Sequence, residues 1–404
     1  MQKKLLAIAV AGVFAAPVVA QAQTSNVQVY GKLYYEYTWM DQGRAPTGTS
    51  NPLGAERESV DMMQTPGSEI GLKGEEKLGG GLSAWFQCAS TADLRGQNQD
   101  GWCSRNSAVG LKGAFGNFWV GNWDTPFKRA AGVNRIVNET GAFGASFVLF
   151  GGSTTVNGRQ NPGQFLRRQN NSINYDSPNF GGFQLSVATN ATNHATSALD
   201  NTTANKARLW SAAGTYRNGP LNLGVGYELH KDFYANSLDG ASATGTSGFG
   251  GDDRAWMLSA GYQLGPVRLG AIYTQQKLET NPAGASGSGS DLKVKAWHLA
   301  ADWKIAGPHG LRAGYTQSDD TTGSFVGSLA GSGSTRIGNA GAGSTGAKLW
   351  QIHYVNKLSK RTEATIGYAR LDNDTSATYS LGGLKAPAAG ETQDTFGVSL
   401  RHSF

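Results

Sequence analysis

The 404-residue chain lacks, after its first 22 residues, any apolar run approaching the ~18 residues that a transmembrane helix needs. Only 39% of its residues are apolar and only 12 are proline, whereas 57 are glycine. From residue 27 to the end we find no helical periodicity, no linker and no break in composition. These absences exclude a helical membrane protein and argue against the two or three soluble domains expected at this length.

The residue patterns of catalytic and metal sites are absent as well. The six histidines are scattered, no G-x-S-x-G segment occurs, and no cluster of histidine and cysteine has the spacing of a zinc site. The segment GAGSTG at 341–346 matches G-x-G-x-x-G, but a strand pattern follows it instead of a helix, so we interpret it as a loop. We therefore expect no enzyme activity, no metal, no cofactor and no nucleic-acid partner.

Residues 1–22 predict a secretory signal peptide. Lys3 and Lys4 precede a short apolar run from Leu5, and the run is followed by a small-x-small cleavage site that ends at Ala22. A buried N-terminal helix is the alternative, but it does not explain why these three features occur in this order. We expect residues 23–404 to form the mature domain, beyond the inner membrane.

The mature chain alternates between apolar and polar residues with a period of two. This period is typical of strands whose two faces meet different environments. In VQVYGKLYYEYTW, for example, Val27, Val29 and Leu33 alternate with Gln28 and Lys32. About sixteen such segments can be counted. They lie near residues 27–39, 67–78, 82–91, 104–115, 118–124, 167–177, 183–192, 207–218, 221–232, 253–264, 267–279, 291–304, 310–319, 347–358, 361–371 and 392–404.

The connections between these segments are alternately short and long. Short turns such as GN, NGP and GP alternate with long loops rich in glycine, serine and threonine, as in outer-membrane barrels. A secreted β-sandwich or propeller also has alternating strands. However, no repeat of 40–50 residues supports a propeller, and the apolar rows often end in aromatic residues that suit a membrane interface. We therefore predict an all-β fold, a transmembrane antiparallel β-barrel of 16 strands.

The segment QDTFGVSLRHSF predicts a last strand with one apolar and one polar side. The apolar side carries Phe396, Val398, Leu400, His402 and Phe404. An even number of strands lets this strand close onto the first one and remove both sheet edges. We expect Phe404 to face lipid at the periplasmic interface, where these residues form a candidate assembly signal, and Arg401 to face a wet interior.

Several segments resemble the general porins of beta-proteobacteria. They are VYGKLYYEY, SEIGLKGEEKLGGGLSAWFQ, NSAVGLKGAFGNFWVGN, NSINYDSPNFGGFQLSVA and GVSLRHSF. The resemblance covers nearly the whole mature chain. It implies a homotrimer in the outer membrane of a Gram-negative bacterium, in contact with lipid, lipopolysaccharide and the barrel-insertion machinery. It also implies a long third loop, near 125–166, folded into a water-filled channel for ions and small hydrophilic solutes.

The resemblance further implies a constriction at which a basic ladder on the wall faces acids on the third loop. The residues that match are Lys32, Arg105 and Arg168, with Arg167 as the alternative, on the wall; Asp124 and Glu139 as acids; and Lys128 and Arg135 as additional charges on the loop. Glu69 departs from the pattern, because relatives often carry arginine there. We therefore expect only weak anion selectivity, with solutes selected by pore width and wall charge.

Cys88 and Cys103 flank a short polar loop between two expected strands. Export past an oxidising periplasm permits a disulfide, and two paired strands could bring the cysteines close enough; two free thiols are the alternative. Other functions remain open from the residues alone. Aromatic residues at inner positions, Tyr30, Tyr34 and Trp85, permit a substrate-specific channel, and the long loops permit an adhesin. An outer-membrane hydrolase is the alternative among enzymes.

Overall fold

The computed structural model describes most of the chain from residue 26 to residue 404. The described residues are 26–44, 59–96, 101–137, 143, 149, 155–156, 159–160, 165–191, 208–231, 252–279, 291–323, 343–382 and 387–404. The expected signal peptide and Glu139 lie outside these residues.

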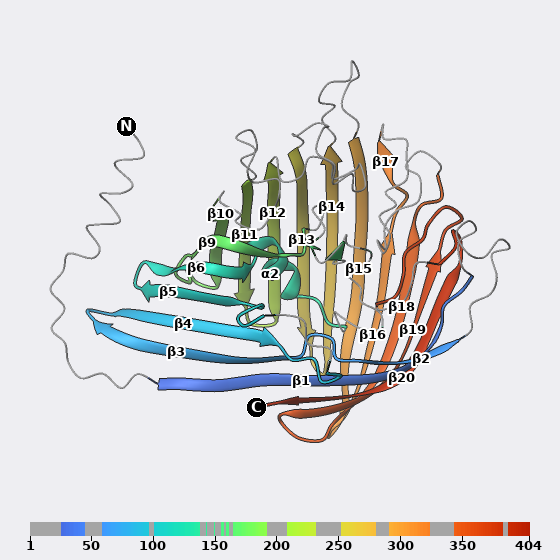
Figure 1. Cartoon of the computed structure of the whole chain (residues 1–404), viewed down its shortest axis with the longest axis horizontal. Helices are drawn as coiled ribbons and strands as arrows, with labels where there is room; N and C mark the ends of the chain where they lie inside the picture. The colour runs from blue at the N-terminus through green and yellow to red at the C-terminus, as the bar shows by residue number, and fades with distance from the viewer. Residues whose placement is uncertain are drawn as a thin grey trace, which may run out of the picture.

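Sixteen strands form a closed antiparallel barrel, as the alternating sequence predicts (Figure 1). In chain order they are β1 (Asn26–Asp41), β3 (Glu69–Gly79), β4 (Leu82–Thr91), β5 (Ser107–Gly113), β6 (Gly116–Asp124), β9 (Arg168–Asp176), β10 (Phe183–Asn190), β11 (Arg208–Asn218), β12 (Leu221–Lys231), β13 (Asp252–Leu264), β14 (Val267–Glu279), β15 (Asp291–Ala306), β16 (His309–Ser318), β18 (Ala347–Lys357), β19 (Thr362–Asn373) and β20 (Thr392–Ser403).

The remaining elements are small. They are the helix α2 (Pro126–Gly132), the two-residue pair β7 (Thr155–Val156) and β8 (Arg159–Gln160), and the short strands β2 (Val60–Gln64) and β17 (Thr322–Gly323), which extend the sheet at its long-loop end. No helix in the described part of the chain is long and apolar enough to cross a membrane.

The barrel closes between its first and last strands. Along one edge, β1 pairs with β20 from Lys32, opposite Ser403, to Asp41, opposite Asp394. Along the other edge, β1 pairs with β3 and then with β2. The second strand therefore begins earlier than the sequence pattern indicates. A turn at Pro66 and Gly67 separates β2 from β3, because proline cannot donate to the ladder and Gly67 has a φ of 67°.

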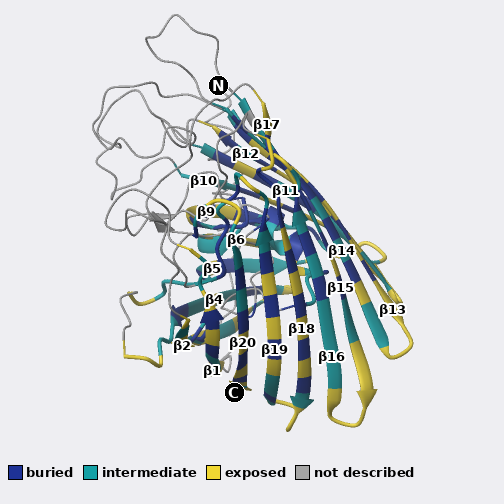
Figure 2. Ribbon diagram, turned by 90° about the vertical axis from the view of Figure 1, so that its right-hand side faces the viewer, coloured by how far each residue is buried: buried dark blue, intermediate teal, exposed yellow. Residues whose placement is uncertain are grey.

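Burial in the barrel is the reverse of burial in a soluble protein. Buried and exposed residues alternate along β16, β18 and β19 (Figure 2), and the exposed ones are largely apolar. Trp350 and Ile352 are about half exposed on the outside, whereas the inward-facing Glu228, His230 and His298 have no exposed surface. A sheet with a polar interior and an apolar exterior is stable only when lipid surrounds it.

Aromatic side chains mark the long-loop boundary of the outer apolar face. Trp297 packs on Tyr315 with ring centroids 4.9 Å apart, and Tyr315 packs on Trp350 at 4.2 Å. Trp256 and Tyr273 continue the row at 5.2 Å. Because such rings prefer the level of the lipid headgroups, this row, called here the aromatic belt, places the upper membrane interface across β13–β18.

Candidate pore constriction

The third long loop begins with α2, which lies against the inner wall beside β11, β12 and β13 (Figure 1). Thr125 caps the helix by accepting a hydrogen bond from the backbone N–H of Lys128, and Pro126 occupies the first turn, where it is tolerated. Wall hydroxyls then fix the helix: Phe127 N donates to Ser211 Oγ at 3.0 Å, and Ser259 Oγ donates to Ala130 O at 3.1 Å.

A track of wall glycines lets the loop lie directly on the sheet. In chain order, Gly224 and Gly226 on β12 face Ala130 and Phe127, Gly261 and Gly270 on β13 and β14 face Asn134, Gly314 on β16 faces Val137, and Gly367 on β19 faces Phe143. A Cβ at Gly261 or Gly270 would overlap with Asn134. The loop therefore crosses the lumen from β12 to β19 along a path that only residues without a side chain leave open.

Hydrogen bonds hold the loop on this track. Asn134 is fully buried and donates from Nδ2 to Ser259 Oγ at 3.0 Å. Arg268 Nη2 donates to Val133 O at 2.7 Å, just beyond α2, and Gln351 Nε2 donates to Phe143 O at 3.0 Å. Because the bonds come from β13, β14 and β18, the loop is fixed along its described length and narrows the lumen.

The loop and the wall enclose a strongly basic cavity of about 730 Å³ in the lumen. Its basic residues are Lys32, Arg105, Lys128, Arg129, Arg135, Arg167, Arg168, Arg268, Arg312 and Arg401, and its acidic residues are Asp124, Asp302 and Glu363. Ten cations against three acids leave a positive potential in the narrow part of the lumen, which concentrates anions there.

One ion-pair cluster lies at the root of the loop. Lys128 Nζ is 2.8 Å from Asp124 Oδ1, and Arg168 Nε is 3.5 Å from the same oxygen and donates to Asn106 Oδ1 at 2.7 Å. Burial lowers the pKa of Lys128, although the Asp124 carboxylate acts in the opposite direction. Asp124 therefore neutralises part of the basic cluster at this end of the loop.

Glu69 and Arg105 form a second pair, with Arg105 Nε donating to Glu69 Oε2 at 2.6 Å. Both side chains are about a quarter exposed. Glu69 is thus on the inner face, as its position in the alternation predicts, and its charge is matched directly by one arginine of the predicted ladder.

The opposite wall carries a network that the sequence reasoning missed. Arg312 donates from Nη1 and Nη2 to the two carboxylate oxygens of Glu363 at 2.9 and 3.0 Å, and its Nε donates to Asp302 at 3.3 Å. Arg401 adds a contact to Glu363 at 3.0 Å. The signal was available, because Arg268 and Arg312 stand at inner positions of the alternating segments VRLGAIYT and LRAGYT.

The described part of the loop is basic, not acidic. Residues 125–137 carry Lys128, Arg129 and Arg135, and Arg129 forms a two-point ion pair with Asp176 at 2.8 Å for each contact. The other predicted acid, Glu139, lies outside the described residues. Among the described residues, the acids of the cavity come from the barrel strands.

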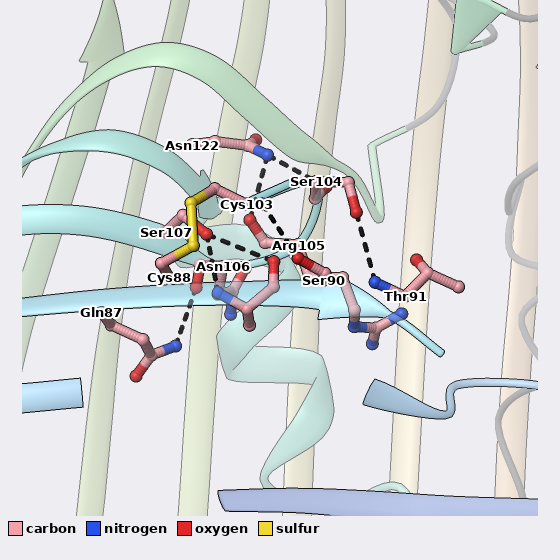
Figure 3. The surroundings of a disulfide bond; sticks show 11 residues. Gln87, Cys88, Ser90, Thr91, Cys103, Ser104, Arg105, Asn106, Ser107 and Asn122 are labelled. Carbon is pink, nitrogen blue, oxygen red and sulfur yellow. Dashed lines mark hydrogen bonds between the residues drawn. A yellow bond between two sulfur atoms is a disulfide. The ribbon is translucent and has the colours of Figure 1, made fainter. Parts of the chain in front are cut away.

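Cys88 and Cys103 are joined in a disulfide, with their Cα atoms 4.7 Å apart (Figure 3). The bond ties the segment before β5 to β4. Around it, Arg105 N donates to Ala89 O at 2.9 Å, and Asn122 Nδ2 donates to the backbone oxygens of Ser104 and Arg105 at 3.2 and 3.0 Å. This cross-linked segment presents the Arg105 side chain to Glu69.

We expect reduction to weaken the barrel near Arg105. The bond closes a loop of 15 residues, and opening a loop of that size costs about 3 kcal/mol. Thiol labelling of the denatured, unreduced protein should detect no free cysteine, and reductant should lower the temperature at which the barrel unfolds in dodecyl sulfate. A Cys88→Ser, Cys103→Ser variant should unfold at the lower temperature with or without reductant. Two labelled cysteines per unreduced chain would contradict the disulfide.

The C-terminal residues complete the barrel at its short-turn end. Phe396, Val398, Leu400 and Phe404 are all more than 40% exposed on the outer face. Phe404 exchanges backbone hydrogen bonds with Gly31 at 3.1 and 3.0 Å, and its ring covers the space where a side chain at Gly31 would stand. The predicted orientation of the last strand is confirmed.

A closed sixteen-stranded barrel with a loop inside its lumen is an architecture of outer-membrane channels. The family model described as Gram-negative porin matches residues 7–377. The chain belongs to the Gram-negative porin family. The predicted barrel, its outer-membrane location and its function as a passive diffusion channel are thereby confirmed.

Individual relatives agree with this assignment. The porin is 26% identical to outer membrane porin protein 32 of Delftia acidovorans over the full length of both proteins. It is 34% identical over 187 residues to the major outer membrane protein P.IB of Neisseria gonorrhoeae, which covers 46% of this chain and 47% of that protein. Among solved structures, the anion-selective porin from Comamonas acidovorans matches with a TM-score of 0.70 and 23% identity, covering 94% of this chain and all of that one.

Proposed function

We propose that this porin is a weakly anion-selective channel for small hydrophilic solutes, and that it has no enzyme activity. The observation that carries the proposal is the excess of basic over acidic residues around a lumen narrowed by the third loop. The structure similar to this fold is named as an anion-selective porin, which supports the same direction. The ion pairs of Asp124, Asp302 and Glu363 moderate the positive potential, so we expect weak selectivity.

Within this proposal, the predicted site residues have two roles. Lys32, Arg105, Arg167 and Arg168 form the basic wall, and Lys128 and Arg135 form the basic edge of the loop. Glu69, Asp124 and Glu139 reduce the local charge. We add Arg268, Arg312 and Arg401 to the wall, because they line the same cavity.

The experiment is a single-channel recording of the purified porin in a planar bilayer under a KCl gradient. We expect an open, water-filled conductance and a zero-current potential whose sign indicates preference for chloride. Liposomes loaded with the porin should swell in small sugars and less in larger ones. A potential of the opposite sign would contradict anion selectivity, and the absence of any conductance would contradict the channel itself.

We also propose that residues 1–22 are removed on export, that residues 23–404 assemble as a homotrimer among lipid and lipopolysaccharide, and that the barrel-insertion machinery binds the last strand. One structure of similar fold, OmpT of Vibrio cholerae, is described as a trimer form. Chemical cross-linking of the native outer membrane tests the trimer.

Replacing Phe404 by alanine should lower the amount of folded barrel in the outer membrane. The ring lies over Gly31 at the seam between β1 and β20, so its loss exposes the closing edge and weakens the apolar row of the last strand. The measurement is the heat-modifiable band in outer-membrane fractions. Phe180→Ala, which removes an exposed ring from a turn, is the control. Equal amounts of folded barrel from both variants would count against an assembly role for Phe404.

A further inference from the structure

Cations gather outside the barrel, above the aromatic belt. Arg254, Lys277 and Lys293 lie side by side, because they are registered partners across β13, β14 and β15. Glu279 and Asp291 stand among them: Arg254 contacts Glu279 at 2.8 Å, and Lys277 and Lys293 each lie 3.6 Å from Asp291. This network holds the three cations in one row at the long-loop edge.

Two more lysines extend the row. Lys295 is exposed between the buried Val294 and Ala296, and Lys348 is exposed between the buried Ala347 and Leu349, so both point outward. Within the described residues, neither forms an ion pair with an acid. The outer face of β13–β18 near its long-loop end therefore has five cations, called here the cationic row, against three acids, Asp252, Glu279 and Asp291.

The other side of the barrel has the opposite charge at the same level. On β1, β2, β19 and β20 the outward charged residues are Asp41, Asp61, Asp372 and Asp394, with Arg370 as the one cation among the described residues. Tyr37 and Tyr368 donate to Asp61 and Asp394 from the outer face, which confirms that these acids point outward. The cationic excess is thus confined to one side of the barrel.

Two apolar grooves lie below the aromatic belt on the cationic side. The larger has a volume of about 880 Å³ and the smaller about 590 Å³, and both are lined by Ala260, Ala271 and Leu299. Alanines at registered positions, Ala260 opposite Ala271 and Ala301 opposite Ala313, make the floor low between larger neighbours. From long-loop end to mid-barrel, this face therefore presents cations, then aromatic rings, then apolar grooves (Figure 2).

We propose that this face binds the lipid A part of lipopolysaccharide, with its phosphates on the cationic row and acyl chains in the two grooves. The long loops of such barrels face outward, so the row lies in the outer leaflet, which in Gram-negative bacteria is built from lipopolysaccharide. Basic clusters at membrane interfaces bind lipid phosphates, and charge-assisted bonds to phosphate are strong. The inference rests on the proposed outer-membrane assembly and names the side of the barrel that takes this partner.

The test compares two triple variants of the full-length porin, purified in detergent and freed of lipid. One carries Lys293→Gln, Lys295→Gln and Lys348→Gln. The control carries Lys304→Gln, Lys357→Gln and Lys360→Gln, which remove the same charge from exposed positions at the short-turn end. Binding of bisphosphorylated lipid A is measured by native mass spectrometry titration. We expect at least about tenfold weaker binding for the first variant and no change for the control.

Further measurements separate the possible outcomes. Wild-type binding by the first variant, or equal weakening by both variants, would overturn the site. Equal binding of lipid A and phosphatidylglycerol by the wild type would overturn lipopolysaccharide as the partner. Weaker binding of monophosphorylated lipid A supports recognition of phosphate. Conductance in planar bilayers is recorded for all three proteins, and a non-conducting wild type would count against the channel without affecting the binding result.

Discussion

Replacing Glu69 by glutamine is expected to raise the chloride-to-potassium permeability ratio of the porin by about two- to threefold. Glu69 faces the lumen and accepts a hydrogen bond from Arg105 at 2.6 Å, so its carboxylate cancels one charge of the basic wall. Removing that carboxylate leaves the guanidinium to act on passing anions. The Debye length is ~8 Å at physiological salt, so the added charge reaches across much of a narrow lumen.

The matched change, Arg105→Gln, should shift the ratio in the opposite direction, because it leaves Glu69 without this arginine. The double variant removes both charges and should lie close to the wild type. The zero-current potential under a KCl gradient measures all three. Asn106, the neighbour of Arg105, is uncharged, and Asn106→Gln provides a control for disturbance of the segment. Potentials that do not move in either single variant would show that this pair does not contribute to selectivity.

Replacing Gly270 by leucine is expected to lower the single-channel conductance and to destabilise the barrel by about 1–3 kcal/mol, the usual cost of overpacking. Any side chain at this position overlaps with Asn134 O, and Ile136 Cδ1 lies only 2.9 Å from the place of the new Cβ. The wall strand is held by hydrogen bonds on both edges, so the loop has to move. It can move only away from the wall, into the lumen.

The control for Gly270→Leu is Ala212→Leu. Ala212 lies on the outer face of β11, between the buried Ser211 and Ala213, so its enlargement faces lipid. We expect the control to keep the wild-type conductance and unfolding temperature in dodecyl sulfate. If Gly270→Leu conducts as the wild type does, the loop is not held against β14 in the working channel.

The barrel could be predicted from the sequence because its cause is local. A period of two assigns every residue of a strand to one of two faces, and alternation of Val27, Val29 and Leu33 with polar neighbours needs no knowledge of distant contacts. Turn glycines and the strand count then imply closure. Segment positions agreed to within a few residues, except where Pro66 divides the second strand into β2 and β3.

The constriction could be predicted only in part. Arg105, Arg168 and Lys128 were placed by resemblance, and all three line the cavity. Arg312 and Glu363 belong to β16 and β19, 51 residues apart, and become partners only because β18 brings both strands onto one wall. The same holds for the glycine track: each glycine is one of 57 in the sequence, and its role depends on which loop residue comes to lie over it.

The sequence by itself therefore determined the barrel, its polar interior and the basic character of the chain, because alternation and composition are properties of neighbouring residues. Only the tertiary structure decided which charges meet in the lumen, how the loop crosses it and which outer side carries the cations of β13–β18 above the two apolar grooves. The physical reason is that ion pairs and packing act over a few ångströms between residues that the chain separates by tens or hundreds of positions.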